Sequence, residues 1–334
     1  MITRVLPERG GVDLQRVLED LAEGPPAVEP FADRTLAFFG EVSRRLTARA
    51  AAASLPDLRA LAFWMRPAHL AELRHRFGSE LPSGTLRFPR GLVFHLPPAN
   101  VPTIFMYSWL LAALAGNRSV VRLSPSRSPV ADEICDVVAE VMGTRGYEGS
   151  LPASAVISYG HEAEVTAALS SAADARVIWG GDSTVSAIRQ IPLPPRAVEI
   201  TFADRYSMAA INTSAYLSSS DRLRTQAAGD FASDTYAFDQ AACSSPRLVA
   251  WCGSADDVER AAPEFYHEVA SIAAQRGHVT DGSAAMLKTL AAASLAADHD
   301  VVACRQYGRD LMVVDLADPR EIARAVVGHG YILS

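Results

Sequence analysis

Short β-branched runs that alternate with helical stretches dominate the chain after Gly84, and they limit its fold more than any other feature. A helix-length segment separates each run from the next, which is typical of βαβ units around a parallel sheet. The four runs of the first half lie at 92–96, 119–123, 156–159 and 176–179. Beyond residue 200 a second α/β section begins, with strands expected at 207–211, 247–251 and 310–316 and long helices at 255–275 and 318–326.

Apolar residues at three- and four-residue intervals predict helices in the region before Gly84. These helices are expected over 12–22, 31–51 and 58–77. A further helix is expected to begin at Pro129, after the N-cap residue Ser128, and to end near Gly143. The sequence therefore predicts an α/β protein with two Rossmann-like parallel-sheet lobes, at 84–203 and 204–334, preceded by an N-terminal helical segment, 1–83.

The composition excludes several classes of protein. The 334 residues are 49% hydrophobic and 21% charged, which is enough apolar material for a large core. A net charge of −7 without a basic stripe argues against a nucleic-acid partner. The longest apolar run, 104–115, is too short to span a bilayer, and no apolar signal region follows Met1. Four cysteines without framework spacing indicate a reducing compartment, so we expect a cytoplasmic protein without disulfides or a metal site.

One cysteine, Cys243, lies in the run FDQAACSSP (238–246), a loop of small and polar residues directly before an apolar strand. A thiol presented in this way suits covalent acyl chemistry, because a thiolate attacks carbonyls well and also leaves well. The other cysteines, Cys135, Cys252 and Cys304, do not share this setting. The alternative interpretation is that Cys243 is a small buried hydrophobic residue.

Asn100 lies in the run PPANVP (97–102), directly after the apolar strand 92–96. This order places it at the carboxyl end of a parallel strand, where open α/β sheets bind ligands. A side-chain amide held there by prolines is suited to donate to a developing oxyanion. Alternatively, Asn100 is a turn residue between prolines.

Arg122, Ser124 and Arg127 lie where the run 119–123 leads into a polar, basic loop ahead of the helix at Pro129. Guanidinium groups and a helix N-terminus are both suited to ribose hydroxyls or a phosphate. The alternative is a solvated loop with ordinary surface arginines.

Gly180 and Gly181 follow the run 176–179, and Ser183 lies just before a helix expected near Thr184. A glycine turn between a strand and a helix also favours phosphate binding. The alternative is that the glycines only permit a positive φ angle.

Taken in their order along the chain, these segments resemble the aldehyde dehydrogenase superfamily. Within it they look most like the LuxC-type acyl-CoA reductases, the fatty-acid reductase component associated with bacterial luminescence. The superfamily has, in the same order, a proline-flanked Asn, a Gly-Asn-x-Val-Val-Lys stretch, a strand ending in Gly-Ser and a later catalytic Cys. The resembling runs are LAFWMRPA (61–68), HLPPANVP (95–102), WGGD (179–182) and the Cys243 segment.

The resemblance implies that Cys243 is the acylated nucleophile, and that Asn100 and the backbone N–H of Cys243 hold the oxyanion. It also implies that 84–203 is the dinucleotide-binding lobe and 204–334 the catalytic lobe. The family uses NADPH, and Arg122 and Arg127 would suit the 2′-phosphate of this cofactor. The implied cofactor-binding residues are Arg122, Ser124, Arg127, Gly180, Gly181 and Ser183.

One departure from the superfamily concerns the glutamate with which hydrolytic aldehyde dehydrogenases activate water. Here the corresponding strand, read as 198–207, has Phe202 at that position. An apolar side chain cannot deprotonate water, so an acyl-enzyme should persist until it meets a thiol or a hydride. Glu199 lies on the opposite face of this strand, so a small shift in alignment does not restore the base.

The resemblance therefore predicts NADPH-dependent reduction of an acyl thioester, bound to CoA or a carrier, to an aldehyde through a Cys243 acyl-enzyme. Two alternatives stay open: an aldehyde dehydrogenase, hydrolytic or CoA-acylating, that works in the oxidative direction, and a non-catalytic relative. An acyl-transferring partner enzyme or carrier protein and a homo-oligomer are consistent with the family. Relatives continue past the point where this sequence ends at Ser334, so we expect their C-terminal return segment to be absent.

Overall fold

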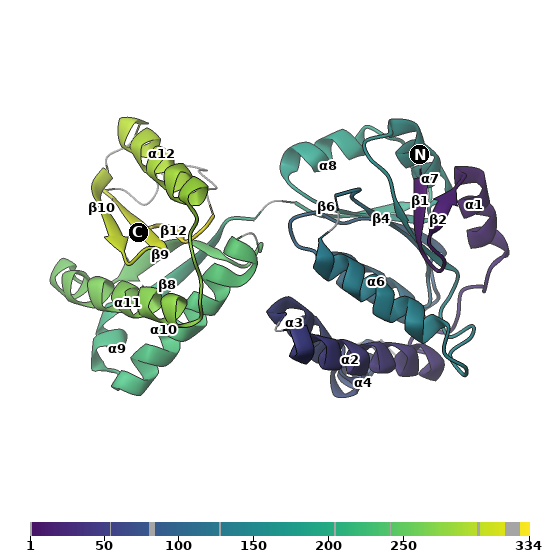
Figure 1. The fold of residues 1–334 in the computed structure, drawn as a ribbon, viewed down its shortest axis with the longest axis horizontal. Helices are drawn as coiled ribbons and strands as arrows, with labels where there is room; N and C mark the ends of the chain where they lie inside the picture. The colour runs from purple at the N-terminus through teal and green to yellow at the C-terminus, as the bar shows by residue number, and fades with distance from the viewer. Residues whose placement is uncertain are drawn as a thin grey trace. The chain divides into compact units, whose positions relative to one another are not determined.

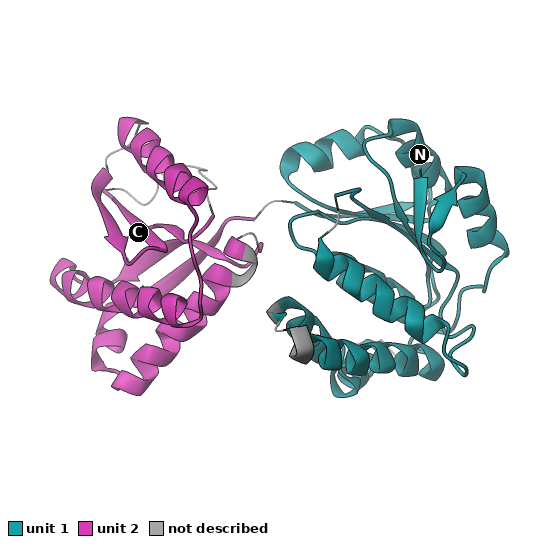
Figure 2. Cartoon of the chain, in the orientation of Figure 1, with its two compact units in different colours: residues 1–204 teal, residues 205–334 magenta. Residues whose placement is uncertain are grey.

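The computed structural model consists of two compact units, residues Met1–Asp204 and Arg205–Ser334 (Figures 1 and 2). It describes residues 2–53, 55–79, 84–126, 128–203, 205–240, 242–298, 301–317 and 328–334. In the described part of the chain, no helix is both long and apolar enough to cross a membrane.

The first unit is built on a seven-stranded sheet in the order β2-β1-β5-β4-β3-β6-β7. Strands β3 to β7 run parallel, and β1 is antiparallel to both β2 and β5. The interior strand β3 is buried along its whole length, as a parallel strand covered on both faces should be. The strands are β1 (Ile2–Leu6), β2 (Gly10–Val12), β3 (Leu92–Leu96), β4 (Arg118–Leu123), β5 (Ser154–Ser158), β6 (Ala175–Trp179) and β7 (Val198–Phe202).

Helices cover both faces of this sheet (Figure 1). Val120 and Val121 are neighbours in β4 and point to opposite faces, so each packs into a different core cluster. The layer on the Val120 side contains α1 (Leu14–Glu23), α7 (Ala163–Ala172) and α8 (Asp182–Arg189). The layer on the Val121 side contains α2 (Asp33–Ala53), α3 (Pro56–Trp64), α4 (Pro67–Ser79), α5 (Ile104–Leu114) and α6 (Pro129–Met142).

The second unit has a five-stranded sheet in the order β10-β11-β12-β9-β8, in which only β10 is antiparallel to its neighbour among the described residues. Leu248 and Val249, adjacent in β9, again pack into separate clusters on the two faces. Its strands are β8 (Ser207–Asn212), β9 (Pro246–Cys252), β10 (Val301–Tyr307), β11 (Leu311–Leu316) and β12 (Tyr331–Leu333). Its helices are α9 (Thr213–Ser218), α10 (Asp221–Tyr236), a 3₁₀ turn (Ala237–Gln240), α11 (Ala255–Gln275) and α12 (Gly282–Asp298).

The predicted helix after Ser128 is confirmed. The Ser128 hydroxyl accepts a hydrogen bond from the backbone N–H of Ala131 at 3.2 Å, and Pro129 occupies the first turn, where its missing N–H costs nothing. The helix ends at Gly143, as expected.

Local breaks change the helices expected before Gly84. The single helix expected over 58–77 is wrong, because Pro67 cannot continue α3 and instead begins α4. Val12 is the last residue of β2 rather than the start of a helix, since Asp13 caps α1 by accepting from the N–H of Gln15 at 2.8 Å. The hairpin β1–β2 was not expected from the sequence at all.

The stretch 198–207, read as one strand, is two strands in separate sheets. Phe202 ends β7 in the first sheet, and Ser207 begins β8 in the second. The helix expected at 255–275 is present as α11. The helix expected at 318–326 lies outside the described residues.

Candidate active site

The order of strands in the first sheet marks a ligand-binding edge. From β3 the chain adds β4 and β5 on one side and then crosses over to add β6 and β7 on the other side. The loops after β3 and β6 therefore leave the sheet in opposite directions at the carboxyl ends of these strands, which is where open α/β sheets bind ligands. The loop after β3 contains Asn100, and the turn after β6 contains Gly180 and Gly181.

Asn100 lies in a bend between β3 and α5, and its side chain is exposed. The segments on both sides are fixed, since β3 is buried and α5 carries the fully buried Trp109 and Leu110. The apolar helix α5 is thus part of the core. Asn100 is an exposed amide presented by a rigid strand and a rigid helix, as a hydrogen-bond donor to a ligand should be.

The Arg122 guanidinium is held at the carboxyl end of the neighbouring strand. Its Nη2 donates to the backbone oxygens of Tyr159 at 3.2 Å and Gly160 at 2.8 Å, directly after β5. Ser124 follows β4, and its hydroxyl accepts from the N–H of Ser126 at 3.3 Å. Arg127 lies outside the described residues.

Gly180 and Gly181 have negative or extended φ angles, so a positive φ is not the reason for either glycine. At Gly180 an added Cβ would lie 3.2 Å from Cγ2 of Thr184, whereas at Gly181 it would meet nothing within 4 Å. Gly181 is the N-cap of α8 and offers no side chain to its first N–H groups. Ser183 is exposed in the first turn, and the carboxylate of Asp182 beside it is a feature that disfavours an anion.

The structure also contains a buried polar chain beneath this edge that sequence patterns did not indicate. The indole N–H of Trp179 donates to Oγ of Ser108 at 3.2 Å, and Ser108 contacts Nδ1 of His95 at 2.8 Å. Nε2 of His95 lies 3.3 Å from Oγ of Ser119. Burial lowers the pKa of His95 to about 3, so the ring is neutral. Both ring nitrogens of His95 have a partner when Ser108 donates to Nδ1 and Nε2–H donates to Ser119.

Trp179 also stacks on Phe202, with ring centroids 3.7 Å apart and planes 10° from parallel. The two residues are directly opposite in the register of β6 and β7, which brings their rings together on one face. The buried polar chain and this stack fix the orientation of the indole next to the Gly180–Gly181 turn.

Glu199, the only carboxylate of β7, is held by two arginines. It accepts from Nε of Arg176 at 3.0 Å and from Nε of Arg189 at 2.8 Å. Burial acts to raise the pKa of Glu199, but the hydrogen bonds from Arg189 and Arg176 outweigh it and lower that pKa. A carboxylate with a lowered pKa and two cationic partners is a poor general base.

Cys243 is exposed in the second unit, on the loop between the 3₁₀ turn and β9. Hydrogen bonds from two serine hydroxyls hold this loop in place. The hydroxyl of Ser207 donates to the Cys243 carbonyl at 2.6 Å, and the hydroxyl of Ser245 donates to the Asp234 carbonyl at 2.7 Å. The N–H of Ser245 also bonds the carbonyl of Ala242 at 3.0 Å. Cys243 is therefore exposed on a hydrogen-bonded segment, residues 242–245, at the amino end of β9.

Exposure alone does not single out Cys243. Cys252 and Cys304 are exposed as well, and only Cys135 is buried. Cys304 lies on the edge strand β10, where partial burial of the thiol raises its pKa. What distinguishes Cys243 is its place on a pinned loop ahead of a strand, which the sequence did indicate.

The structure thus brings Asn100, Arg122, Ser124 and the Gly180–Gly181 turn, with Ser183, to one edge of the first sheet. Cys243 belongs to the other unit, so its approach to Asn100 stays a prediction.

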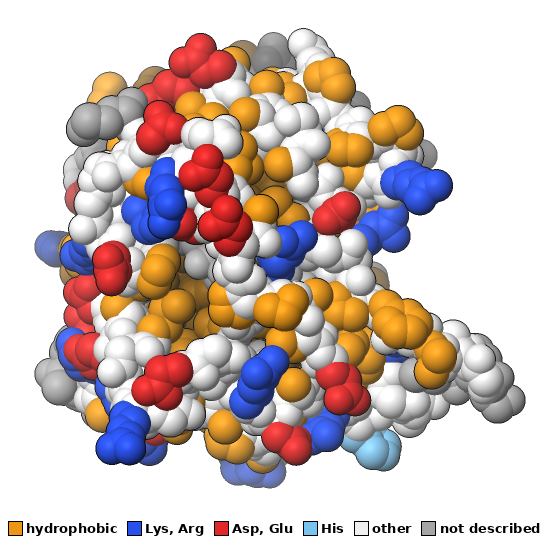
Figure 3. All heavy atoms as spheres, turned by 90° about the vertical axis from the view of Figure 1, so that its right-hand side faces the viewer, with side chains coloured by type: hydrophobic (Ala, Val, Ile, Leu, Met, Phe, Trp, Pro, Cys, Tyr) orange, Lys and Arg blue, Asp and Glu red, His pale blue; other side chains and the backbone are white. Residues whose placement is uncertain are grey.

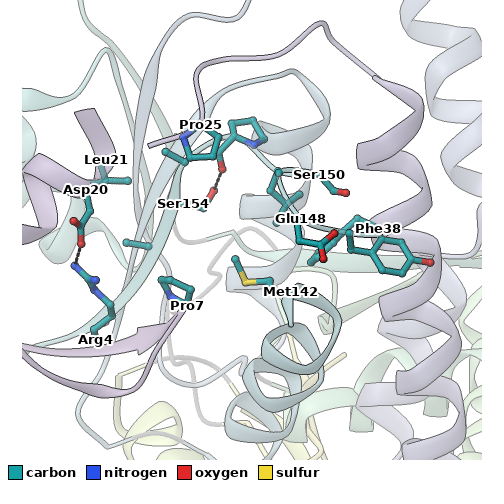
Figure 4. Close-up of a pocket in the computed structure, with 16 residues that line it drawn as sticks. Arg4, Pro7, Asp20, Leu21, Pro25, Phe38, Met142, Glu148, Ser150 and Ser154 are labelled. Carbon is teal, nitrogen blue, oxygen red and sulfur yellow. Dashed lines mark hydrogen bonds and ion pairs between the residues drawn. The ribbon is translucent and has the colours of Figure 1, made fainter. Parts of the chain in front are cut away.

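A pocket of ≈ 250 Å³ lies elsewhere in the first unit (Figure 4). Arg4 and Asp20 form an ion pair at one side of it, and Phe38 and Met142 line the other. The pocket lies beside the segment that leads into the amino end of β5, at the opposite edge of the sheet from Asn100 and Gly180.

The surface of the first unit in Figure 3 has acidic and basic side chains interspersed with apolar ones.

Comparison with known proteins decides the family. The sequence profile of the LuxC acyl-CoA reductases matches residues 71–293, more than half of the chain. The chain belongs to the LuxC acyl-CoA reductase family. This LuxC-family chain is also 27% identical over 170 residues to the long-chain acyl-protein thioester reductase of Photorhabdus laumondii subsp. laumondii. That alignment covers 50% of the chain and 33% of the relative, so the matched region spans a third of the relative's length.

Solved structures show that the LuxC-family chain has an aldehyde dehydrogenase-like fold. A putative aldehyde dehydrogenase from Burkholderia cenocepacia is similar with a TM-score of 0.66 at 16% identity, over 99% of this chain and 77% of that one. A NAD-dependent benzaldehyde dehydrogenase from Corynebacterium glutamicum gives the same TM-score at 14% identity, over 100% of this chain and 80% of that one. The predicted α/β class with two largely parallel sheets is confirmed.

Proposed function

We propose that the protein reduces an acyl thioester to an aldehyde with NADPH, through an acyl-enzyme on Cys243. The observation that carries the proposal is the exposed thiol on a pinned loop, in a chain that belongs to the LuxC acyl-CoA reductase family. The division into a dinucleotide-binding lobe before residue 204 and a catalytic lobe after it is part of this proposal.

The residues at the edge of the first sheet fit a nicotinamide dinucleotide. Gly181 leaves open space that a Cβ would fill, next to the uncapped start of α8, which suits a close backbone approach by a pyrophosphate. Arg122 lies two strands away from this turn in the same sheet and is the group we assign to the ribose or its 2′-phosphate, with Ser124, Ser183 and Arg127 as further contacts. When bound, the reduced dinucleotide supplies the hydride that converts the acyl group to an aldehyde.

Cys243 supplies the covalent chemistry. Its thiolate attacks the thioester carbonyl, and the tetrahedral oxyanion expels the carrier thiolate to leave an acyl-cysteine. Asn100 and the backbone N–H of Cys243 are the proposed donors to that oxyanion, and loss of one such donor costs about a hundredfold or more in rate. After reduction, the thiohemiacetal collapses to free aldehyde, and the Cys243 thiolate leaves and is protonated.

The absence of a water-activating base on β7 favours reduction over hydrolysis. Phe202 offers no proton acceptor, and Glu199 is occupied by Arg176 and Arg189. The acyl-enzyme is therefore long-lived toward water, as reduction of its thioester carbonyl by hydride requires.

The substrate we propose is a long-chain acyl group. The Photorhabdus relative is named a long-chain acyl-protein thioester reductase, which supports an acyl thioester carried by CoA or by a protein. An acyl-transferring enzyme or a carrier protein would then be the partner, and a cytoplasmic homo-oligomer stays a prediction.

The proposal is tested by intact mass after incubation with hexadecanoyl-CoA, followed by a chase with NADPH and measurement of aldehyde. We expect an acyl adduct that disappears as aldehyde is released. Cys243→Ala should abolish the adduct, whereas Cys252→Ala and Cys304→Ala, which remove the other exposed thiols, should retain it. An adduct that decays to free acid, or one that survives in Cys243→Ala, would contradict the proposal.

A further inference from the structure

The side chain of Gln240 is fully hydrogen-bonded in the interior of the second unit, three residues before Cys243. Its Oε1 accepts from the N–H groups of Gly330 at 2.9 Å and Tyr331 at 3.1 Å. Its Nε2 donates to the carbonyls of Pro246 at 2.9 Å and Tyr331 at 3.0 Å. Both lone-pair positions and both N–H groups of the amide are thus used, and the residue is only 1% exposed.

These contacts close the cysteine loop at its base. Pro246 is the first residue of β9, so the bond from Gln240 to Pro246 joins the two ends of the segment that carries Cys243. The bonds to Gly330 and Tyr331 attach the same point to the start of β12, the strand next to β9. The Gln240 amide therefore holds both ends of this segment, and the start of β12, at one point.

The backbone at this point does not hold its conformation unaided. Asp239 and Gln240 have φ angles of 55° and 65°, in the left-handed region that residues with a Cβ avoid. The carboxylate of Asp239 contacts Nδ1 of His329, and the backbone N–H of His329 donates to the Asp239 carbonyl at 3.2 Å. On the other side, Gly330 has no room for a side chain, because an added Cβ would lie 2.3 Å from the Asp310 carbonyl. Such a conformation persists only where surrounding contacts determine it.

We propose that Gln240 is a positioning residue for Cys243: its amide holds the loop in the conformation in which the Cys243 thiol and backbone N–H act together on an acyl carbonyl. The proposal rests on the function proposed for Cys243. Gln240 touches neither substrate nor cofactor and acts only through the loop. Its effect should therefore be confined to reactions that need the thiol and the backbone N–H in a fixed relation.

The test compares two reactions of the same thiol. Acylation by hexadecanoyl-CoA needs an oxyanion donor, whereas alkylation by iodoacetamide needs only an accessible thiolate. In Gln240→Glu the oxygen still accepts from Gly330 and Tyr331, but the two donated bonds are lost. We expect acylation of Cys243 to slow about a hundredfold, because a displacement near 1 Å has effects of that order. Alkylation of Cys243, followed by peptide mass, should change by less than about twofold, since it needs no such alignment.

Asn117→Asp is the matched control. The Asn117 amide is also buried, accepts from the N–H groups of Arg90 and Gly91 and donates to the Ala112 carbonyl, but it lies in the first unit. The Asn117→Asp protein should lose about as much stability as the Gln240→Glu protein, but Cys243 should be acylated at the wild-type rate. Gln240→Met removes the same contacts without introducing a buried charge. It should likewise slow acylation of Cys243 and leave its alkylation nearly unchanged.

Equal losses in both reactions, or no loss in either, would overturn the role of Gln240. Failure of the wild-type protein to be acylated would overturn the proposed function instead. In that case hydrogen exchange tests separately whether Gln240 holds the loop. Peptides that contain Cys243 should exchange faster in Gln240→Glu than in the wild type, and unchanged exchange would overturn the proposal.

Discussion

Acidification should destabilise the first unit through His95. This imidazole is fully buried between Ser108 and Ser119, and burial lowers its pKa from 6.5 to about 3. The unfolded chain binds a proton at this residue below pH 6.5, whereas the folded unit does not until pH is near 3. The pKa is lowered in the folded state, so the stability is present above pH 6.5 and is lost as pH falls below it.

The size of the effect follows from the shift. Each pH unit between 6.5 and 3 removes about 1.4 kcal/mol of unfolding free energy, and the loss from pH 7 to pH 5 is about 2 kcal/mol. This range lies above the region where most carboxylates titrate, so His95 should dominate the slope of stability against pH.

Urea unfolding followed by tryptophan fluorescence measures this slope. Trp64, Trp109 and Trp179 report on the first unit once Trp251 of the second unit is replaced by Phe. In this background, His95→Gln should be less stable at pH 7 but should lose about 2 kcal/mol less between pH 7 and pH 5. Parallel slopes in the two proteins would refute the assignment of a neutral, proton-excluding site to His95.

Three further substitutions test other contacts. Glu199→Gln leaves the buried guanidinium of Arg176 without a counter-charge and should destabilise the first unit by about 3–5 kcal/mol in urea unfolding; a loss under about 1 kcal/mol would contradict this. Ser128→Ala removes the N-cap of α6 and should cost about 1 kcal/mol, with faster hydrogen exchange in its first turn; unchanged exchange would argue against the cap. Gly181→Ala should leave stability within about 0.5 kcal/mol, because a Cβ there meets nothing, but should weaken NADPH binding in a fluorescence titration; unchanged affinity would remove Gly181 from the cofactor site.

The sequence predicts the parts of this fold that depend on local patterns. Strands such as β3 and β6 are short apolar runs bounded by turn residues, and the helix after Ser128 carries its own start and stop signals. The rule that ligands gather at carboxyl ends of parallel strands then places Asn100 and Gly180 at one edge without any structure.

Contacts between distant segments are what the sequence does not predict. β1 is paired with β5, about 150 residues later, and nothing local in Ile2–Leu6 signals that partner. Gln240 is an ordinary polar residue in a loop until β12 arrives ninety-one positions later with the groups that its amide bonds. Strand alternation places Glu199 on the opposite face from Phe202, but its two arginine partners follow from register and packing, which the sequence does not show.

The reversal of strand order between β3 and β6 has a consequence for the protein's tolerance of change. The two ends of the first sheet should accept substitution and insertion unequally. At the carboxyl ends, the loop after β3 and the turn after β6 border the proposed cofactor site, so even a single added residue would alter the fit of a ligand. The loop from Thr144 to Pro152 precedes β5 at the opposite end, where an insertion would lie far from the proposed cofactor site. In a library of random insertions selected for activity, insertions should therefore be depleted after β3 and β6 and retained in the loop before β5.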